Sequence, residues 1–247
     1  MSQDQLFIGI DSGTQGTKVV VLSRNKRRIV ASAHAAHEII ETPRGGREQQ
    51  PEWWTAACEQ AMQTVLQSEE IDGARIKAIG VSGQQHGLVA LDDQGRVIRP
   101  AKLWCDTETA PQCRTLTERA GGREAVIKAI GNPIAAGYTA SKVVWLKEQE
   151  PENYARLRTI LLPHDYLNYW LTGKCRTEDG DASGTAYFDV CQRRWSGALL
   201  NAIDDSGRLK NCLPEIMAPA EACGPLLDQR AEAWGLSKDV LVSAGGG

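Results

Sequence analysis

An aspartate followed by a glycine-rich turn is the first place where this sequence could do chemistry. Asp11 ends a short apolar run, and Gly13 and Gly16 bracket a turn that carries several hydroxyl groups. Successive backbone amides in such a turn can cradle a phosphate, and a carboxylate at its mouth can hold Mg²⁺ directly or through water. An ordinary glycine-rich hairpin capped by the aspartate is the alternative, because a lone glycine-rich turn is a weak signal.

The residues after the turn distinguish it from two common nucleotide-binding loops. Residues 19–22 read Val-Val-Val-Leu, which favours a strand, whereas Walker and Rossmann loops both open a helix. Gly16 is followed by Thr17 and Lys18, which does not match the Gly-Lys-Ser/Thr of a Walker loop. The pattern therefore predicts a β-hairpin whose turn faces a ligand.

Two later strand ends carry side chains that suit a polyhydroxylated ligand. Gln85 and His86 follow the buried-type strand 76–83, and each can donate and accept hydrogen bonds. Trp104 could form an apolar wall against the C–H face of a sugar, and Asp106 could accept hydrogen bonds from its hydroxyls. The alternatives are a turn histidine bonded to the backbone and a tryptophan that belongs to the core.

A third polar segment contains three carboxylates within residues 177–181. It lacks the alternating carboxylates and the terminal glutamate of an EF-hand Ca²⁺ loop. We interpret it as a wall of the cleft or as the start of a helix, with Asp181 as the carboxylate that faces inward. His164 lies where another helix is predicted to begin, and we interpret it as a structural residue and not as a ligand.

The elements predicted around these residues belong to an α/β domain. Residues 6–22 and 27–37 are predicted to form three antiparallel strands joined by tight turns. A helix is predicted over residues 52–68, where Pro51 is a good start signal, and a buried strand over residues 76–83. A meander followed by a helix and a strand indicates a mixed sheet, and ligands often bind at strand ends of open α/β sheets.

Further elements are predicted from apolar spacing and from glycine and proline signals. The predicted helices cover residues 107–120 (with Thr107 as N-cap), 141–149, 164–171 and 228–234. The predicted strands cover residues 88–91, 96–98, 160–163 and 239–244.

Composition and charge narrow the class of protein. A chain of 247 residues can form one large domain or two small ones. An apolar fraction of 42% and a charged fraction of 24% are ordinary for a globular protein. The net charge of −3 argues against a nucleic-acid partner, which would need a basic stripe. No apolar run approaches about 18 residues, so no membrane span is predicted.

The N-terminus and the cysteines indicate the compartment. The first residues are acidic and enter a strand at once, which is unlike a signal peptide. The seven cysteines are odd in number and show neither a C-x-x-C pair nor zinc-ligand spacing. We therefore expect reduced thiols in a cytoplasmic protein.

The end of the chain suggests a boundary. The predicted strand 239–244 runs into three glycines, at which the chain stops. Glycines at a strand end allow the backbone to approach a ligand closely. We therefore expect the chain to be cut at a domain boundary.

Six motifs in order make a more specific pattern than any one of them. Together they resemble the N-terminal domain of the FGGY carbohydrate kinases and cover essentially the whole chain; within that family the sequence is most similar to the xylulokinases. The motifs are GIDSGTQGTK, SGQQHG, KLWCD, LLPHDYLNYWLTG, DGDASGT and VSAGGG. The resemblance implies an α/β fold of the ribonuclease H-like (actin-like ATPase) type, with a mixed β-sheet flanked by helices. It also implies a C-terminal ATP-binding domain that faces this one across a cleft.

The resemblance implies a role for each candidate residue. Asp11 would lie near Mg²⁺ and the transferring phosphate. Gln85 and His86 match the sugar-binding pair, and Trp104 and Asp106 match a Trp-x-Asp motif beside the sugar. The residues implied to approach the γ-phosphoryl group of ATP are Gly13, Thr14, Gln15 and Thr17.

Two features depart from the family pattern. Glu108 stands where several relatives have arginine, which changes the charge near the sugar end. In the family, VSAGGG is followed by an Asp-Asn pair whose aspartate is the base for the sugar hydroxyl. The chain stops after Gly247, one residue before that position.

The implied activity is transfer of phosphate from ATP to O5 of D-xylulose, which gives D-xylulose 5-phosphate. We expect residues 1–247 alone to be inactive and to bind sugar weakly at most. Family members often dimerise, so a homodimer is a further expectation. One alternative is a kinase for ribulose, gluconate, glycerol or another polyol, and another is a noncatalytic sugar-binding module. A dinucleotide enzyme is disfavoured because no G-x-G-x-x-G opens a helix.

Overall fold

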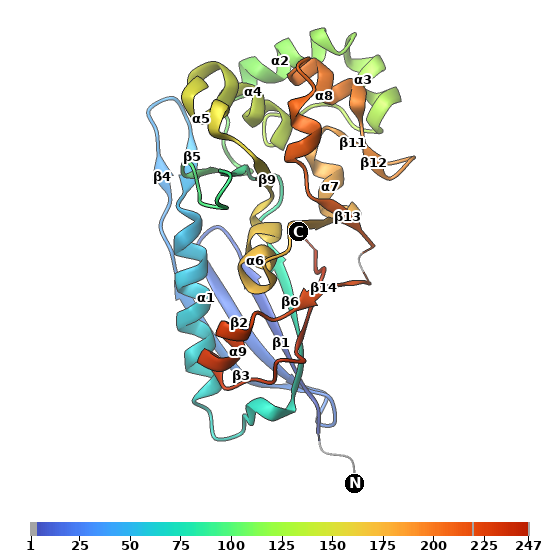
Figure 1. Cartoon of the computed structure of the whole chain (residues 1–247). Helices are drawn as coiled ribbons and strands as arrows, with labels where there is room; N and C mark the ends of the chain where they lie inside the picture. The colour runs from blue at the N-terminus through green and yellow to red at the C-terminus, as the bar shows by residue number, and fades with distance from the viewer. Residues whose placement is uncertain (1–3, 219, 247) are drawn as a thin grey trace.

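A six-stranded mixed sheet forms the centre of the protein, seen in a computed structural model that describes residues 4–218 and 220–246 (Figure 1). The strand order is β14-β15-β6-β1-β2-β3. β1 is antiparallel to β2, β2 is antiparallel to β3, and β6 and β15 run parallel to β1. The bounds are Leu6–Ser12 (β1), Gly16–Ser23 (β2), Arg28–Ala36 (β3), Ile76–Gly83 (β6), Ala222–Pro225 (β14) and Leu241–Ser243 (β15). This confirms the predicted meander and mixed sheet.

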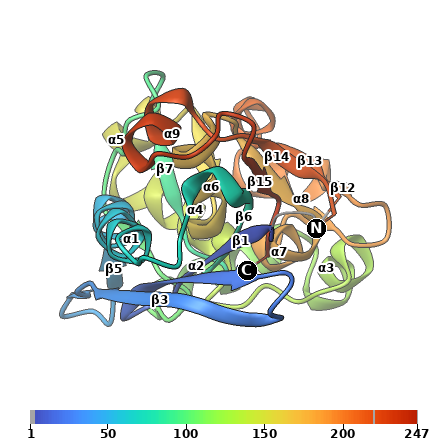
Figure 2. The ribbon, with the colours of Figure 1, turned by 90° about the horizontal axis from the view of Figure 1, so that it is seen from below.

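Three helices cover one face of this sheet. They are α1 (Pro51–Leu66), α6 (Pro163–Thr172) and α9 (Asp228–Trp234). Figure 2 shows α1 and α6 on the same side of β3. Alternate residues of β1, namely Leu6, Ile8 and Ile10, are buried in the core that these helices share with the sheet, as expected for a strand with one covered face. The opposite face carries Gly9 and Asp11 and is more open.

The start and the buried face of α1 follow from signals in its own sequence. Pro51 occupies the first helical turn, where its missing N–H costs nothing. Trp54, Cys58 and Met62 follow at helical spacing, and all three are fully buried. The indole N–H of Trp54 donates to Gln49, so this large side chain is both packed and hydrogen-bonded.

A second group of helices, shown at the top of Figure 1, has its own hydrophobic core. It contains α2 (Ala110–Arg119), α3 (Arg123–Ile130), α4 (Thr139–Gln149), α5 (Pro151–Arg156) and α8 (Gly197–Ile203). The sequence did not predict α3, α5 or α8. The prediction that Thr107 caps α2 is wrong: the helix begins at Ala110, and the Thr107 hydroxyl instead donates to the Gly45 carbonyl.

Short elements connect these parts. The short strands are Ile40–Glu41 (β4), Arg47–Gln49 (β5), Val89–Leu91 (β7), Ala101–Lys102 (β8), Thr159–Leu161 (β9), Arg176–Glu178 (β10), Phe188–Asp189 (β11), Arg194–Trp195 (β12) and Glu215–Met217 (β13). The short helices are α7 (Asp179–Ala182), η1 (Gly73–Arg75), η2 (Ser183–Thr185) and η3 (Arg208–Cys212). The predicted strand 96–98 is reduced to a bridge between Leu91 and Val97.

Two observations bear on the predicted compartment. All seven cysteines are free thiols. Within residues 4–218 and 220–246, no helix combines the length and hydrophobicity that crossing a bilayer requires.

Candidate active site

A cavity of about 380 Å³ lies at the C-terminal ends of β1 and β6. These strands are parallel, and Asp11 is paired with Ser82 in their register, so both strands deliver their end residues to one sheet edge. This volume is in the range of small-ligand sites. The residues that line it are Asp11, Gly13, Thr14, Gly83, Gln84, Gln85, His86 and Trp104. The predicted proximity of Asp11, His86 and Trp104 is therefore present.

The glycine-rich turn is held in shape from within and from across the cavity. The Gly13 N–H donates to the Gly16 carbonyl at 3.0 Å, which closes the hairpin. The Thr14 hydroxyl donates to Gln84 Oε1 at 3.2 Å and accepts from the Trp104 indole N–H at 3.1 Å. The turn is thus tied to the ends of two other segments that line the cavity.

Two of the four residues predicted to bind phosphate do not line this cavity. Thr17 is fully buried, and its hydroxyl is hydrogen-bonded to Ser12 Oγ at 3.0 Å inside the hairpin. Gln15 is exposed at the tip of the turn. Gly13 and Thr14 are the two that reach the cavity wall.

His86 is held in an unusual backbone conformation. Its φ is +61°, in the left-handed region that few non-glycine residues adopt. Its ring lies edge-on to Tyr138, with 4.5 Å between the ring centroids, and a Cβ at Gly184 would overlap it. Burial lowers the pKa of His86 and the nearby Lys142 adds to this, while Asp181 opposes it. The imidazole is therefore neutral near pH 7 and can both donate and accept.

Lys142 holds the His86 backbone in place through a hydrogen bond to its carbonyl. This residue was not predicted from the sequence. Its ammonium is fully buried and donates to the carbonyls of His86 (3.0 Å), Tyr138 (3.2 Å) and Gly137. Burial lowers the pKa of Lys142 to about 7, against the attraction of Asp106. A lysine in an amphipathic helix resembles a surface residue, so the local pattern held no signal for this role.

Trp104 is a wall of the cavity and not a core residue. Its side chain is 51% exposed, although tryptophan is usually well buried. The backbone carbonyl of Trp104 packs so closely on Gly137 that a Cβ there would lie 2.6 Å away. The structure therefore decides between the two interpretations that the sequence left open.

Asp106 is not brought to the cavity. It is fully buried, and it accepts hydrogen bonds from the backbone N–H groups of Arg47 and Glu108, both at 3.0 Å. Its carboxylate also pairs with Lys102 Nζ at 2.9 Å. The same ammonium contacts Glu108 at 2.9 Å and Glu48 at 3.1 Å. Glu108, the departure from the family pattern, is thus one partner of a buried cation.

This cluster sets the protonation of its lysine. Burial alone would lower the pKa of Lys102, but hydrogen bonds to Asp106 and Glu108 outweigh it and raise the pKa. The ammonium also lies 4.0 Å from the centre of the Trp145 ring, a cation–π contact. The cluster anchors the strand end that carries Trp104.

The glycine segment after β15 reaches the same sheet edge. The Gly246 N–H donates to the Val81 carbonyl at 3.2 Å, beside the end of β6. Gly245 has φ of +72°, and a Cβ there would overlap the Val81 carbonyl, so only glycine fits. Gly247, the last residue of the predicted motif, lies outside the described residues.

These features define an α/β domain with a cavity at the ends of two of its parallel strands, the place where open α/β sheets commonly bind ligands. The sequence model for the N-terminal domain of the FGGY family of carbohydrate kinases matches residues 6–247. The chain belongs to this family.

The relatives found are sugar kinases about twice as long. The chain is 44% identical over 246 residues to the xylulose kinase of Haemophilus influenzae, covering 98% of this chain and 50% of that protein. It superposes on the crystal structure of a xyloylose kinase from Brucella ovis with a TM-score of 0.89 and 34% identity, covering 98% and 49% of the two chains. It also superposes on a gluconate kinase structure from Lactobacillus acidophilus with a TM-score of 0.89 and 25% sequence identity. That match covers 99% of this chain and 48% of the gluconate kinase. The chain thus spans about half the length of the relatives it matches.

Proposed function

We propose that this chain is the N-terminal, sugar-binding domain of a two-domain kinase that transfers phosphate from ATP to D-xylulose, giving D-xylulose 5-phosphate. The observation that carries the proposal is one cavity lined by Asp11, the glycine turn, His86 and Trp104. The names of the relatives support the sugar, since three curated relatives at 44%, 36% and 38% identity are xylulose kinases.

Asp11 is the residue that we assign to Mg²⁺. Asp11 is exposed and lines the cavity, which fits an ion that uses one or two carboxylates and keeps several waters. Held by Asp11, Mg²⁺ would supply charge neutralisation for the transferring group. The task left to the protein is positioning, because phosphoryl transfer depends mainly on alignment and charge neutralisation.

The phosphate end of the cavity is formed by Gly13 and Thr14, which approach the γ-phosphoryl group in this proposal. The Thr14 hydroxyl is already hydrogen-bonded to Gln84 and Trp104, so it lies in a fixed position when phosphate arrives. Gln15 and Thr17 then act through the turn: Gln15 at its tip and Thr17 as an internal brace bonded to Ser12.

The sugar end is formed by Gln85, His86 and Trp104. The neutral imidazole and the Gln85 amide supply both donors and acceptors for sugar hydroxyls, and the exposed indole face covers the C–H side. Asp106 supports this wall indirectly, because its carboxylate is engaged by Lys102 and two backbone amides. The base for the sugar hydroxyl is, in this proposal, the aspartate that follows VSAGGG in the family.

Gluconate is the second candidate substrate. The gluconate kinase from Lactobacillus acidophilus superposes with a TM-score of 0.89, equal to that of the Brucella ovis xyloylose kinase. Fold similarity therefore does not separate the two sugars. Gluconate carries a carboxylate, and the described residues that line the cavity include no lysine or arginine to pair with it. This favours a neutral ketopentose.

Calorimetric titration of the chain with D-xylulose, D-ribulose, gluconate and glycerol tests the proposed substrate. We expect D-xylulose to bind best, with a Kd of about 1 mM or weaker because half of the cleft is missing. The variant Gln85→Ala should lose affinity, whereas Gln94→Ala, in an exposed turn away from the cavity, should not. Tighter binding of gluconate would replace the proposed substrate, and no sugar binding would contradict the site.

A coupled ADP-release assay tests the proposed activity. We expect xylulose-dependent turnover from the full-length protein that contains this chain, and none from residues 1–247 alone. Turnover by the chain alone would contradict the two-domain mechanism. Light scattering of the full-length protein tests the homodimer expected from the family.

A further inference from the structure

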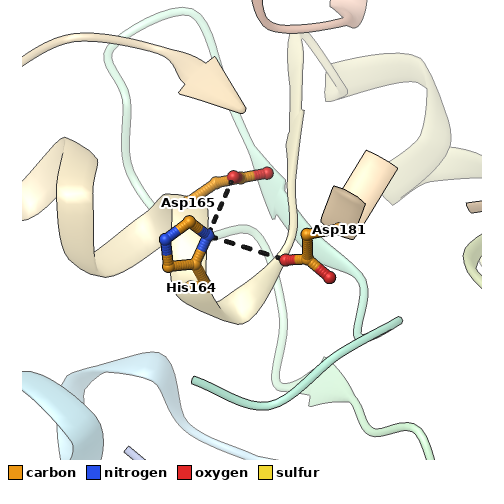
Figure 3. Close-up of side chains that lie close together, drawn as sticks. All are labelled: His164, Asp165 and Asp181. Atoms are coloured by element: carbon orange, nitrogen blue, oxygen red, sulfur yellow. Dashed lines mark ion pairs between the residues drawn. The ribbon is translucent and has the colours of Figure 1, made fainter. Parts of the chain in front are cut away.

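A buried histidine and two buried aspartates form a cluster behind the cavity (Figure 3). His164 Nδ1 lies 3.4 Å from Asp165 Oδ1 and 3.6 Å from Asp181 Oδ2. All three residues are at least 95% buried, with exposed fractions of 0%, 1% and 5%. His164 and Asp165 begin α6, and Asp181 lies in α7, so the cluster joins two elements that are separate in the sequence.

The hydrogen-bond partners of His164 indicate which of its nitrogens carry protons. Nε2 lies 2.6 Å from the carbonyl oxygen of Ala244 and 3.1 Å from Asn168 Nδ2. Because the carbonyl is the nearer of the two and can only accept, we assign a proton to Nε2. Nδ1 makes no direct hydrogen bond, but it lies within ion-pair distance of the carboxylates of Asp165 and Asp181, so we assign it a proton as well. Both nitrogens can be protonated only in the imidazolium form.

The electrostatics of the cluster agree with this assignment. Burial alone would lower the pKa of His164, but Asp165 and Asp181 outweigh it and raise the pKa to about 10. Within the described structure, Asp181 accepts no hydrogen bond, and the His164 ring is the cationic group within ion-pair distance of it. Burial raises the pKa of Asp181, and His164 opposes that rise. An ionised carboxylate in such a place needs a nearby cation.

One side of the imidazolium holds the glycine segment. The Ala244 carbonyl accepts from His164 Nε2 and from Asn168 Nδ2, the latter at 2.8 Å. Ala244 directly precedes Gly245 and Gly246, whose backbone runs beside Val81 at the end of β6. Glycines tolerate many backbone conformations, so a fixed carbonyl just before them restricts where the segment can go.

On its other side the imidazolium faces Asp181, which is linked through α7 and η2 to the surface that packs against the His86 ring. We call His86 and this surface the His86 wall. Asp181 is in α7, whose first turn is capped by the Glu178 carboxylate. α7 leads directly into η2, where Gly184 lies directly against the His86 ring. A displacement of Asp181 would therefore move the surface on which His86 rests.

We propose that His164 is a positioning residue: as a buried cation between Asp165 and Asp181, it fixes the glycine segment at Ala244 and the His86 wall relative to each other. This rests on the proposed function, in which His86 contacts the sugar. The sequence had indicated only a structural role for His164. The structure adds the charge and the two parts of the site that the charge connects.

NMR of the ¹⁵N-histidine-labelled native chain tests the charge directly. The chain has four histidines, and the spectrum of His164→Gln assigns the resonances of His164. We expect His164 to show two protonated ring nitrogens at pH 8, where an ordinary histidine is neutral. A neutral ring at pH 7 would overturn the proposal. So would a shift of these resonances on adding Zn²⁺ together with a rise in melting temperature, because the cluster would then be a metal site.

Amide hydrogen exchange tests the positioning. We expect the Gly246 amide to exchange about 10-fold faster in His164→Gln than in the native chain, because its segment loses an anchor. His164→Lys should restore most of the protection, since an ammonium can donate to both aspartates and to the Ala244 carbonyl. An unchanged Gly246 rate in folded His164→Gln, or a lysine variant no better than the glutamine variant, would contradict the proposal.

A matched control separates positioning from general loss of stability. Asp204→Asn removes another buried carboxylate charge, which accepts a hydrogen bond from Tyr154 in the helical part of the molecule. It should lower the melting temperature and leave Gly246 protected; equal deprotection by both variants would show a merely structural role.

Sugar binding distinguishes failure of this inference from failure of the proposed function. D-xylulose affinity should fall about 3- to 10-fold in His164→Gln, because the His86 wall moves, and should recover in His164→Lys. An unchanged affinity in folded His164→Gln would remove the His86 half of the proposal. The native chain could bind no sugar while the NMR and exchange results come out as expected. The proposed function would then be wrong, and the positioning role of the His164 cation would still be supported.

Discussion

The indole N–H of Trp104 donates to the hydroxyl of Thr14 across 3.1 Å, although 90 residues separate the two in the sequence. This bond joins the wall assigned to the sugar to the turn assigned to the phosphate. Thr14 in turn donates to Gln84, so the end of β6 belongs to the same arrangement. A sugar and a phosphate bound on these surfaces would be held at a defined separation.

The first prediction concerns this hydrogen bond. Trp104→Phe and Thr14→Val should each weaken D-xylulose binding, but the double variant should lose less than the sum, because both remove the same bond. We expect a coupling energy of about 0.5–1.5 kcal/mol, the net contribution of one hydrogen bond. Calorimetric titration of the four proteins measures it. Strict additivity would mean that the bond does not organise the site.

The second prediction concerns the metal-side carboxylate. In the full-length protein, Asp11→Asn should lower kcat at least about 100-fold, the scale seen when one preorganised electrostatic group is removed. Because Asp11 is exposed at a strand end, the variant should change the stability of the chain by less than about 0.5 kcal/mol. Steady-state kinetics and urea unfolding measure the two effects. A variant that keeps its kcat would exclude Asp11 from the metal site.

The third prediction concerns the buried lysine cluster. Lys102→Met should destabilise the fold by about 3–5 kcal/mol, because it leaves Asp106, Glu48 and Glu108 without their shared cation in a buried place. Glu108→Gln should cost less, since Lys102 keeps two carboxylate partners. Urea unfolding followed by circular dichroism measures both. A larger loss in Glu108→Gln would show that Glu108, and not Asp106, is the main partner of Lys102.

The fourth prediction concerns pH. The pKa of His164 is about 10 in the folded protein and has an ordinary value of 6.5. A raised pKa stabilises the fold fully below pH 6.5, and this stabilisation is lost as the pH rises toward 10. The stability difference between the native chain and His164→Gln should therefore be greatest near pH 6 and shrink as the pH is raised. Urea unfolding at several pH values checks this; a difference that grows with pH would contradict the cationic histidine.

Much of the fold could be predicted because its signals are local. The hairpin around Asp11, the strand 76–83 and the helix from Pro51 follow from alternation, turn residues and start signals between near neighbours. Parallel strands deliver their ends to one edge of a sheet, so the grouping of Asp11 and His86 followed from the same signals. Trp104 follows β8, which belongs to a separate antiparallel sheet, so only the tertiary structure placed it beside them. The unpredicted helices α3, α5 and α8 depend on packing within a second core, which short windows do not record.

The sequence by itself determined the opening meander, the presence of a mixed sheet and the chemistry available at the strand ends. Only the tertiary structure decided which of those groups meet a ligand. Asp106 and Thr17 turn inward because Lys102, Arg47 and Ser12 offer them partners, and Trp104 turns outward because Thr14 receives its N–H. Lys142 and His164 are buried for the same reason, because backbone carbonyls of other segments accept their hydrogen bonds. A buried polar group must find its hydrogen-bond partners, and here these mostly come from other elements, so local pattern could not place them.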